Sequence, residues 1–167
     1  MTHVLLSIGS NKNNPQQQIK TALANLNQRF EHVRMSYLYL TEPVGAVIQE
    51  PFINAAISLE THLSAEKLLN YLMEVEQQAS RNRELEIPNG PRNLDIDIIL
   101  FGDTILTEPA LTIPHPRFRA RRFVLEPLNE IAPESIDPVT RKRIHILLDA
   151  CLDTSWVKPL EEELLPL

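Results

Sequence analysis

Apolar residues recur along the chain at two spacings, and these spacings predict its strands and helices. Short apolar or alternating runs bounded by turn residues predict four strands, over Val4–Ile8, His32–Leu40, Phe52–Glu60 and Leu94–Phe101. Apolar residues at every third or fourth position predict helices over Pro15–Phe30, Ser64–Ser80, Arg119–Leu128 and Arg141–Leu152. The chain therefore begins with alternating strands and helices and ends with two helices.

The order of the first six elements is strand, helix, strand, strand, helix, strand. This order is typical of the ferredoxin-like α+β fold, a βαββαβ sandwich whose helices cover one face of the sheet. The last two helices then form a C-terminal helical extension. Because the sequence contains no repeat, low-complexity tract or linker, we expect a single domain over residues 1–167.

Alternation along the strands separates an apolar face from a polar one, because successive side chains of a strand point to opposite sides. Asp95 and Asp97 share one face of the last strand, and Phe52 and Asn54 share one face of the third. The apolar residues that alternate with them are Ile53, Ala55, Ile57 and Leu59 in the third strand and Leu94, Ile96 and Ile98 in the last. If the helices cover the apolar faces, the opposite face combines an aromatic ring, an amide and a carboxylate pair.

The two aspartates suggest a site for a cation. On a strand, Asp95 and Asp97 lie roughly 6–7 Å apart at Cα and point the same way. Their oxygens suit Mg²⁺, usually with phosphate oxygens completing its coordination. Arg92, just before the strand, offers a forked donor for a phosphate. The alternative is an ordinary half-exposed strand with two aspartates on its solvated side, and the spacing alone does not decide between the two.

Composition is ordinary for a globular protein, but arginine is unevenly distributed. The 167 residues are 43% hydrophobic and 23% charged, with a net charge of −6. This negative charge argues against general nucleic-acid binding. A local cluster comprises Arg81, Arg83, Arg92, Arg117, Arg119, Arg121 and Arg122. Such a cluster in an acidic chain fits a small anionic ligand, and the alternative is a set of surface salt bridges with neighbouring glutamates.

The sequence also lacks several common signals. Its apolar runs are too short to cross a membrane, and its first residues do not resemble a signal peptide. The only cysteine, Cys151, fits a reducing compartment, so we expect a cytoplasmic protein. The four glycines form no phosphate-binding loop. In a nucleotide enzyme, arginines and a metal ion would therefore bind the phosphates.

An ordered set of motifs resembles one enzyme family. Its main segment is Gly90-Pro91-Arg92-Asn93-Leu94-Asp95-Ile96-Asp97-Ile98. Further matching segments are Ile8-Gly9-Ser10-Asn11, Thr41-Glu42-Pro43-Val44-Gly45, Phe52-Ile53-Asn54-Ala55-Ala56, Leu111-Thr112-Ile113-Pro114-His115, Arg121-Arg122-Phe123-Val124-Leu125-Glu126-Pro127-Leu128 and Glu130-Ile131-Ala132-Pro133. Together they resemble the signature of the 6-hydroxymethyl-7,8-dihydropterin pyrophosphokinases, enzymes of folate biosynthesis, over roughly Val4 to Leu148.

The resemblance implies a reaction and its cofactor. Enzymes of this family transfer pyrophosphate from ATP to the hydroxymethyl group of the pterin and release AMP. By resemblance, Asp95 and Asp97 bind two Mg²⁺ ions, and Arg81 and Arg92 act with them in catalysis. The expected small-molecule partners are ATP and the pterin, without nucleic acid or membrane, and we expect a monomer.

The resemblance also implies the binding residues. Those expected to bind the pterin are Thr41, Val44, Phe52, Asn54 and Phe123, with the two phenylalanines stacking on its faces. Those expected to bind the nucleotide are Glu76, Arg83, Arg92, Ile98, Thr112, His115 and Arg121. The expected positions of Phe52, Asn54, Asp95 and Asp97 agree with the polar sheet face that alternation alone predicts.

Two other classes of function fit part of the sequence. A non-catalytic ferredoxin-like binding module would explain the fold but not paired aspartates beside an arginine cluster. A metal-dependent phosphoesterase would also use a pair of metal ions. Formation of AMP that depends on the pterin would separate a pyrophosphokinase from both. Ser7 and Cys151 lack a base at motif spacing, which argues against a covalent nucleophile.

Overall fold

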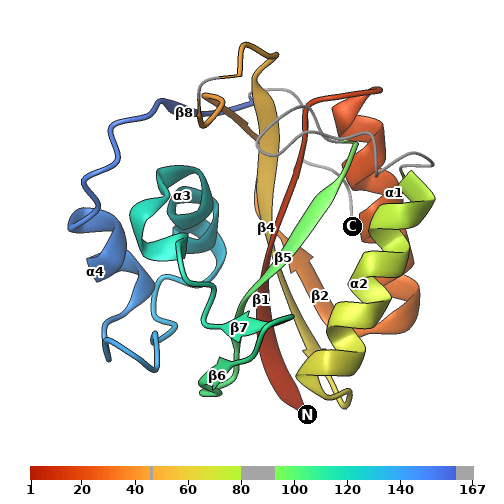
Figure 1. Cartoon of the computed structure of the whole chain (residues 1–167), viewed down its shortest axis with the longest axis vertical. Coiled ribbons are helices and arrows are strands. Elements are labelled where there is room, and N and C mark those ends of the chain that lie inside the picture. The colour runs from red at the N-terminus through yellow and green to blue at the C-terminus, as the bar shows by residue number, and fades with distance from the viewer. Residues whose placement is uncertain (46, 80–92, 161–167) are drawn as a thin grey trace.

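An antiparallel sheet forms the centre of the molecule (Figure 1). The computed structural model describes residues 1–45, 47–79 and 93–160. The long strands lie side by side in the order β5 (Asp95–Phe101), β1 (Thr2–Ser10) and β4 (Phe52–Thr61). The other edge of β4 pairs with β2 (Glu31–Met35) and β3 (Tyr39–Thr41), and β3 pairs in turn with β8 (Val157–Pro159).

Helices flank this sheet on both sides. The helices α1 (Pro15–Arg29) and α2 (Ala65–Ala79) lie against one face, and α3 (Arg122–Ile131) and α4 (Ile144–Asp149) lie on the opposite side (Figure 1). The predicted α+β combination of an antiparallel sheet with packed helices is thus confirmed. The C-terminal helices cover part of the face that α1 and α2 leave open. Within the described ranges, no helix is long and apolar enough to cross a membrane.

Under α1 and α2, the central strands present an apolar surface. In neighbouring strands Ala55, Ile8 and Ile96 lie side by side, and so do Ile57, Leu6 and Ile98. None of these six side chains is more than 4% exposed. They pack in one cluster with Ile19 and Leu26 of α1 and Leu68 and Leu72 of α2. Burial of each leucine or isoleucine side chain stabilises the fold by about 1.5–3 kcal/mol.

The opposite face of the sheet has two different halves. In one half, Leu5, Ile99 and Leu100 pack in a second cluster with Val124 and Leu125 of α3. The pairing of β1 with β5 shifts register between Leu5 and Leu6, which leaves Ile99 as an extra residue in β5. A bulge of this kind interrupts the strict alternation of side chains, so Ile99 and Leu100 both join the second cluster. The other half begins at Asp95 and contains the pocket.

The predicted strand His32–Leu40 is wrong as a continuous element, because Ser36 interrupts it. The chain forms β2, leaves the ladder at Ser36, and returns as β3. Ser36 N–H donates to the carbonyl of Ala56 at 2.9 Å, and Ala56 N–H donates to the Ser36 hydroxyl at 2.9 Å. The hydroxyl thus replaces a backbone carbonyl as acceptor, and alternation of apolar residues does not reveal this exchange.

Other predicted boundaries also differ. The strand predicted over Val4–Ile8 extends at both ends, and the helix predicted from Arg119 begins at Arg122, after a 3₁₀ turn over Phe118–Ala120. The helix predicted over Arg141–Leu152 spans only Ile144–Asp149. It begins later because Arg141 adopts φ 63°, a left-handed conformation that helices exclude, and Arg143 is extended. A small hairpin, β6 (Leu106–Thr107) and β7 (Thr112–Ile113), and the strand β8 were not predicted, because strands of two or three residues have no detectable period.

Candidate active site

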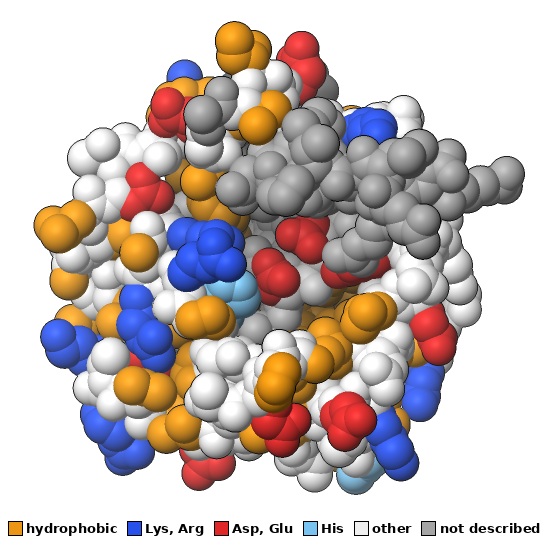
Figure 2. Space-filling view, viewed as in Figure 1, with side chains coloured by type: hydrophobic (Ala, Val, Ile, Leu, Met, Phe, Trp, Pro, Cys, Tyr) orange, Lys and Arg blue, Asp and Glu red, His pale blue; other side chains and the backbone are white. Residues whose placement is uncertain are grey.

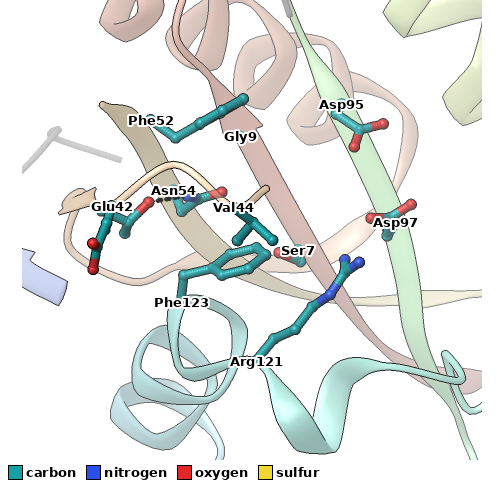
Figure 3. Close-up of a pocket in the computed structure, with 11 residues that line it drawn as sticks. Ser7, Gly9, Glu42, Val44, Phe52, Asn54, Asp95, Asp97, Arg121 and Phe123 are labelled. Carbon is teal, nitrogen blue, oxygen red and sulfur yellow. Dashed lines mark hydrogen bonds between the residues drawn. The ribbon is translucent and has the colours of Figure 1, made fainter. Parts of the chain in front are cut away.

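A pocket opens on the sheet face that α3 only partly covers (Figure 3). Its walls come from β1, β3, β4, β5 and the start of α3. The lining residues are Ser7, Gly9, Thr41, Glu42, Val44, Phe52, Asn54, Asp95, Asp97, Arg121 and Phe123. Figure 2, drawn in the orientation of Figure 1, shows acidic side chains and a group of basic ones near the middle of the molecule. The pocket therefore brings together all five predicted pterin residues, both predicted metal ligands and one predicted nucleotide residue.

The two aspartates project from β5 into this pocket. Asp95 lies opposite Gly9 of β1, and Asp97 lies opposite Ser7. Both carboxylates are half-buried and point to the same side of the sheet (Figure 3). The described part of the chain contains no group of three or more His, Cys, Asp or Glu residues placed to hold a metal ion. The two carboxylates offer oxygen ligands of the kind that suit a hard cation such as Mg²⁺, whose remaining ligands would be water or substrate oxygens.

Arg121 supplies positive charge beside the carboxylates. Its side chain extends from the residue before α3 toward Asp97 (Figure 3). Burial lowers the pKa of Arg121, as does the neighbouring Arg117, while Asp97 and Asp95 oppose that shift. An arginine stays protonated under such conditions. Its Cζ atom lies 5.5 Å from the centre of the Phe123 ring, so the guanidinium and the ring form a cation–π interaction.

His115 lies close to the same arginines but is not among the residues that line the pocket. Burial lowers its pKa to about 4, and the charges of Arg121 and Arg117 contribute. Its Nδ1 is 3.2 Å from the backbone N–H of Arg117, which donates to it. The ring is therefore neutral at pH 7, with Nδ1 as acceptor and the proton on Nε2, where it is available as a donor.

A close approach between two strands forms the floor of the pocket. Asn54 is buried, and its Nδ2 donates to Thr41 Oγ1 at 2.7 Å. A Cβ atom at Gly9 would lie 2.3 Å from Asn54 Oδ1. Only glycine permits this contact, because every other residue carries a Cβ. Phe52 and Phe123 lie on opposite sides of the Asn54 amide in Figure 3.

Besides His115, three further predicted nucleotide residues lie outside the pocket lining. Glu76 is buried in α2, and its Oε1 accepts the backbone N–H of Ile96 at 2.9 Å. Ile98 belongs to the apolar cluster under α1 and α2, and Thr112 pairs with Thr107 in the small hairpin. Their nucleotide roles stay predictions. The predicted residues Arg81, Arg83 and Arg92 lie outside the described ranges.

Three lining residues, Ser7, Gly9 and Glu42, were missing from the sequence-based prediction. Ser7 and Gly9 alternate along β1 and lie opposite Asp97 and Asp95. The signal was therefore present in the period of two, as a small polar residue and a glycine in an otherwise apolar strand. Glu42 directly follows Thr41, the last residue of β3, and its signal was its place in the matching segment Thr41-Glu42-Pro43-Val44-Gly45.

Comparison with known proteins identifies the family. The model of the 7,8-dihydro-6-hydroxymethylpterin-pyrophosphokinase family matches residues 5–133. The 2-amino-4-hydroxy-6-hydroxymethyldihydropteridine pyrophosphokinase of Pseudomonas aeruginosa is 39% identical over 150 residues, which span 89% of this chain and 91% of that relative. The enzyme of the same name from Haemophilus influenzae is 37% identical over 140 residues, which span 83% of this chain and 86% of the relative.

A solved structure supports the fold. A crystal structure of Plasmodium falciparum HPPK-DHPS superposes with a TM-score of 0.73 at 17% identity. The match covers 89% of this chain, which spans 45% of the Plasmodium chain. The likeness at this identity concerns the fold alone, and the family model and the bacterial relatives carry the assignment. The chain therefore belongs to the 7,8-dihydro-6-hydroxymethylpterin-pyrophosphokinase family.

Proposed function

We propose that this chain transfers the terminal pyrophosphate of ATP to the hydroxymethyl oxygen of 6-hydroxymethyl-7,8-dihydropterin, a step of folate biosynthesis. In this reaction the hydroxymethyl oxygen forms a bond to the β-phosphorus of ATP. The bond from that phosphorus to the α,β-bridging oxygen breaks, AMP leaves with this oxygen, and the hydroxyl proton passes to solvent. One observation carries the proposal: two aromatic rings, a fixed amide and a carboxylate pair line one pocket of a chain in this family.

The aromatic half of the pocket fits a flat heterocycle. We propose that Phe52 and Phe123 stack on the two faces of the pterin ring. Asn54 is held by its hydrogen bond to Thr41, so its amide presents a fixed set of donors and acceptors to the ring edge. Thr41 and Val44 line the same side of the pocket and complete the recognition of that edge.

The charged half of the pocket fits the triphosphate. We propose that Asp95 and Asp97 hold two Mg²⁺ ions, which when bound neutralise phosphate charge. Arg121 points into the same region and adds a fixed cation. His115 is neutral and offers its Nε2 proton to a phosphate oxygen. The other proposed nucleotide residues are Glu76, Arg83, Arg92, Ile98 and Thr112, and Arg81 and Arg92 are proposed to assist catalysis.

Four broader proposals accompany this activity. The antiparallel order β5-β1-β4-β2, with α1 and α2 on one face, supports a ferredoxin-like arrangement. Both apolar clusters use the same central strands, which supports a single pyrophosphokinase domain over residues 1–167. The single cysteine, Cys151, supports a reducing compartment, and we propose a monomer acting in the cytoplasm.

The decisive experiment measures AMP formation from ATP with and without the hydroxymethyl pterin, in Mg²⁺ and in excess EDTA. We expect AMP and the pterin diphosphate in equal amounts only when the pterin and Mg²⁺ are both present. Phosphate release without the pterin would instead identify a phosphoesterase. Binding of both ligands without any AMP would identify a binding module and overturn the proposal.

A further inference from the structure

The segment 153–160, which we call the C-terminal strap, connects two walls of the pocket. It leaves α4, passes α3 and ends as β8 at the edge of the sheet (Figure 1). There Val157 lies opposite Thr41, and Pro159 lies opposite Tyr39. Beyond β8, Leu160 N–H donates to the carbonyl of Leu38 at 2.9 Å. The strap therefore extends the sheet beside β3, whose last residue lines the pocket.

The strap also holds the residue that follows β3. Glu42 N–H donates to the carbonyl of Trp156 at 3.1 Å, and Trp156 N–H donates to Glu42 Oε2 at 3.1 Å. Glu42 is thus fixed through both its backbone and its side chain. Its neighbour Thr41 orients the Asn54 amide. One end of the strap therefore supports the wall that carries the amide and its threonine partner.

The other end of the strap supports the start of α3. This helix has no side-chain cap from its own N-cap residue, Arg121. Instead, Asp153 Oδ2 accepts the N–H of Arg122, the first helical residue, at 2.9 Å. The carboxylate also places a negative charge at the positive end of the helix dipole. Asp153 therefore caps, from a distant part of the chain, the helical turn that carries Phe123.

Asp153 is itself held in place on its second oxygen. Oδ1 accepts the N–H of Ser155 at 2.9 Å and its hydroxyl at 2.6 Å. The carbonyl of Asp153 accepts Nε of Arg122 at 2.8 Å. Burial alone would raise the pKa of Asp153, but the hydrogen bonds from Ser155 and Arg122 lower it overall, so the group stays ionised near neutral pH. A rigid turn thus joins the strap to α3.

We infer that Asp153 is a positioning residue for the pterin, which sets the separation between Phe123 and the wall formed by Thr41 and Asn54. This inference rests on the proposed function. Without the carboxylate, the first turn of α3 loses its cap and frays, as uncapped helix ends do. Phe123 then no longer stays at a fixed distance from the opposite wall. Asp95 and Asp97 belong to β5, at the opposite edge of the sheet from β8, and should keep their positions. Arg121, the N-cap residue of α3, directly precedes the frayed turn, so we also expect a smaller loss in the phosphate half.

The test compares Asp153→Ala with Asp149→Ala, an exposed aspartate at the end of α4. We expect Asp153→Ala to raise the KM for the pterin about fivefold to tenfold, the range that corresponds to the loss of one helix cap. The KM for ATP and kcat should change by a smaller factor than the KM for the pterin, and Asp149→Ala should change none of these values. Equal losses for both substrates, or a loss confined to kcat, would overturn the inference.

A double-mutant cycle asks whether Asp153 acts through Phe123. If it does, Asp153→Ala should add little to the effect of Phe123→Ala on pterin affinity. Fully additive effects would contradict the inference. Ser155→Ala, which removes one hydrogen bond from Asp153, provides a milder second variant if Asp153→Ala does not fold, and it should shift pterin affinity in the same direction.

Direct binding separates this inference from the proposed function. Pterin affinity can be measured by fluorescence or calorimetry whether or not the wild-type protein forms AMP. If the wild-type chain is inactive but its pterin affinity still falls on Asp153→Ala, the proposed reaction is wrong and the positioning role of Asp153 is supported. If the wild-type chain is active but neither Asp153→Ala nor Ser155→Ala changes pterin affinity, only the positioning role of Asp153 is contradicted.

Discussion

The two faces of the sheet use neighbouring residues of the same strands for different purposes. Leu6 and Ile57 fill the apolar cluster under α1 and α2, whereas Ser7 and Asn54, on the same strands, line the pocket on the other face. Side chains that are consecutive in sequence are therefore separated by the full thickness of the sheet. The comparison teaches that the stability and the activity of this protein can be altered independently by substitutions one residue apart.

The pocket face is divided again along its length. At the Asp95 end of β5 the strands carry polar side chains that no helix in the described part of the chain fully covers, whereas beyond the Ile99 bulge they are sealed by α3. His115 N–H donates to the carbonyl of Ile99 at 3.0 Å, so the segment that carries His115 is attached at the bulge itself. The bulge thus marks the boundary between the reactive half of this face and its structural half.

The largest expected effect on stability comes from the apolar face. Leu6→Ala removes a fully buried side chain and should lower the free energy of unfolding by about 2–5 kcal/mol. The kcat of the molecules that remain folded should stay near the wild-type value. Urea denaturation and active-site titration measure the two quantities. Ser7→Ala is the matched substitution on the pocket face. An equal loss of stability in this variant would contradict the division of roles between the two faces.

The largest expected effect on activity comes from the carboxylates. Asp97→Ala should lower turnover by about 10²–10³-fold, because it removes charge stabilisation that is strongest in the transition state. The free energy of unfolding should change little, since the side chain is only half-buried. Asp95→Ala should behave similarly, and the double variant should lose far less than the product of the two effects. Steady-state kinetics of all three variants would reveal independent, multiplicative losses if the two aspartates do not share a site.

A smaller effect should distinguish the two halves of the pocket. Phe123→Ala removes one stacking surface and should weaken pterin binding by about 1–3 kcal/mol, the range for stacking of a base on an aromatic ring. Affinity for ATP should change little. Calorimetry with each ligand separately provides the measurement. Equal losses for ATP and pterin would mean that Phe123 supports the whole pocket rather than the pterin.

The last expected effect, absent at neutral pH, is a pH dependence of stability at the boundary of the two halves. The pKa of His115 lies at about 4 in the folded protein against an ordinary value of 6.5. Between these pH values the unfolded chain binds a proton at His115 that the folded chain does not. The contribution of His115 to the free energy of unfolding is therefore at its full value above pH 6.5 and falls as the pH approaches 4.

The variant His115→Gln isolates this contribution. The free energy of unfolding of the wild type minus that of the variant should rise between pH 4 and pH 6.5 and stay constant above it. Denaturant titrations across this range give the difference. A difference that is flat or falls with increasing pH would show that burial does not depress the pKa of His115.

Alternation in the sequence predicted the face of each central strand, because a period of two is strong in long strands. Alternation alone, without the family resemblance, places Phe52, Asn54, Asp95 and Asp97 on one face, and all four line the pocket. Motifs then supplied Thr41, Val44, Arg121 and Phe123, which belong to loops or element ends and have no period. The apolar clusters were predictable for the same reason as the strand faces.

What the sequence could not predict depends on single polar contacts between distant residues. The hydroxyl of Ser36 interrupts the second strand, although the apolar pattern continues across it. Asp153 caps Arg122 from 31 residues away, and Trp156 contacts Glu42 at a separation of 114. Neither contact has a local signature, since aspartate and tryptophan at these positions are equally compatible with an exposed tail.

Gly9 makes the floor of the pocket difficult to alter by mutation. Any other residue would bring a Cβ to 2.3 Å from Asn54 Oδ1, and the amide cannot turn away without losing its hydrogen bond to Thr41. An inhibitor that covers Gly9 and binds Asn54 would therefore contact a surface where a substitution that excludes the drug also displaces the amide that we propose to bind the pterin. Resistance to such a compound would have to arise at the exposed rim, for example at Val44, which is 43% exposed.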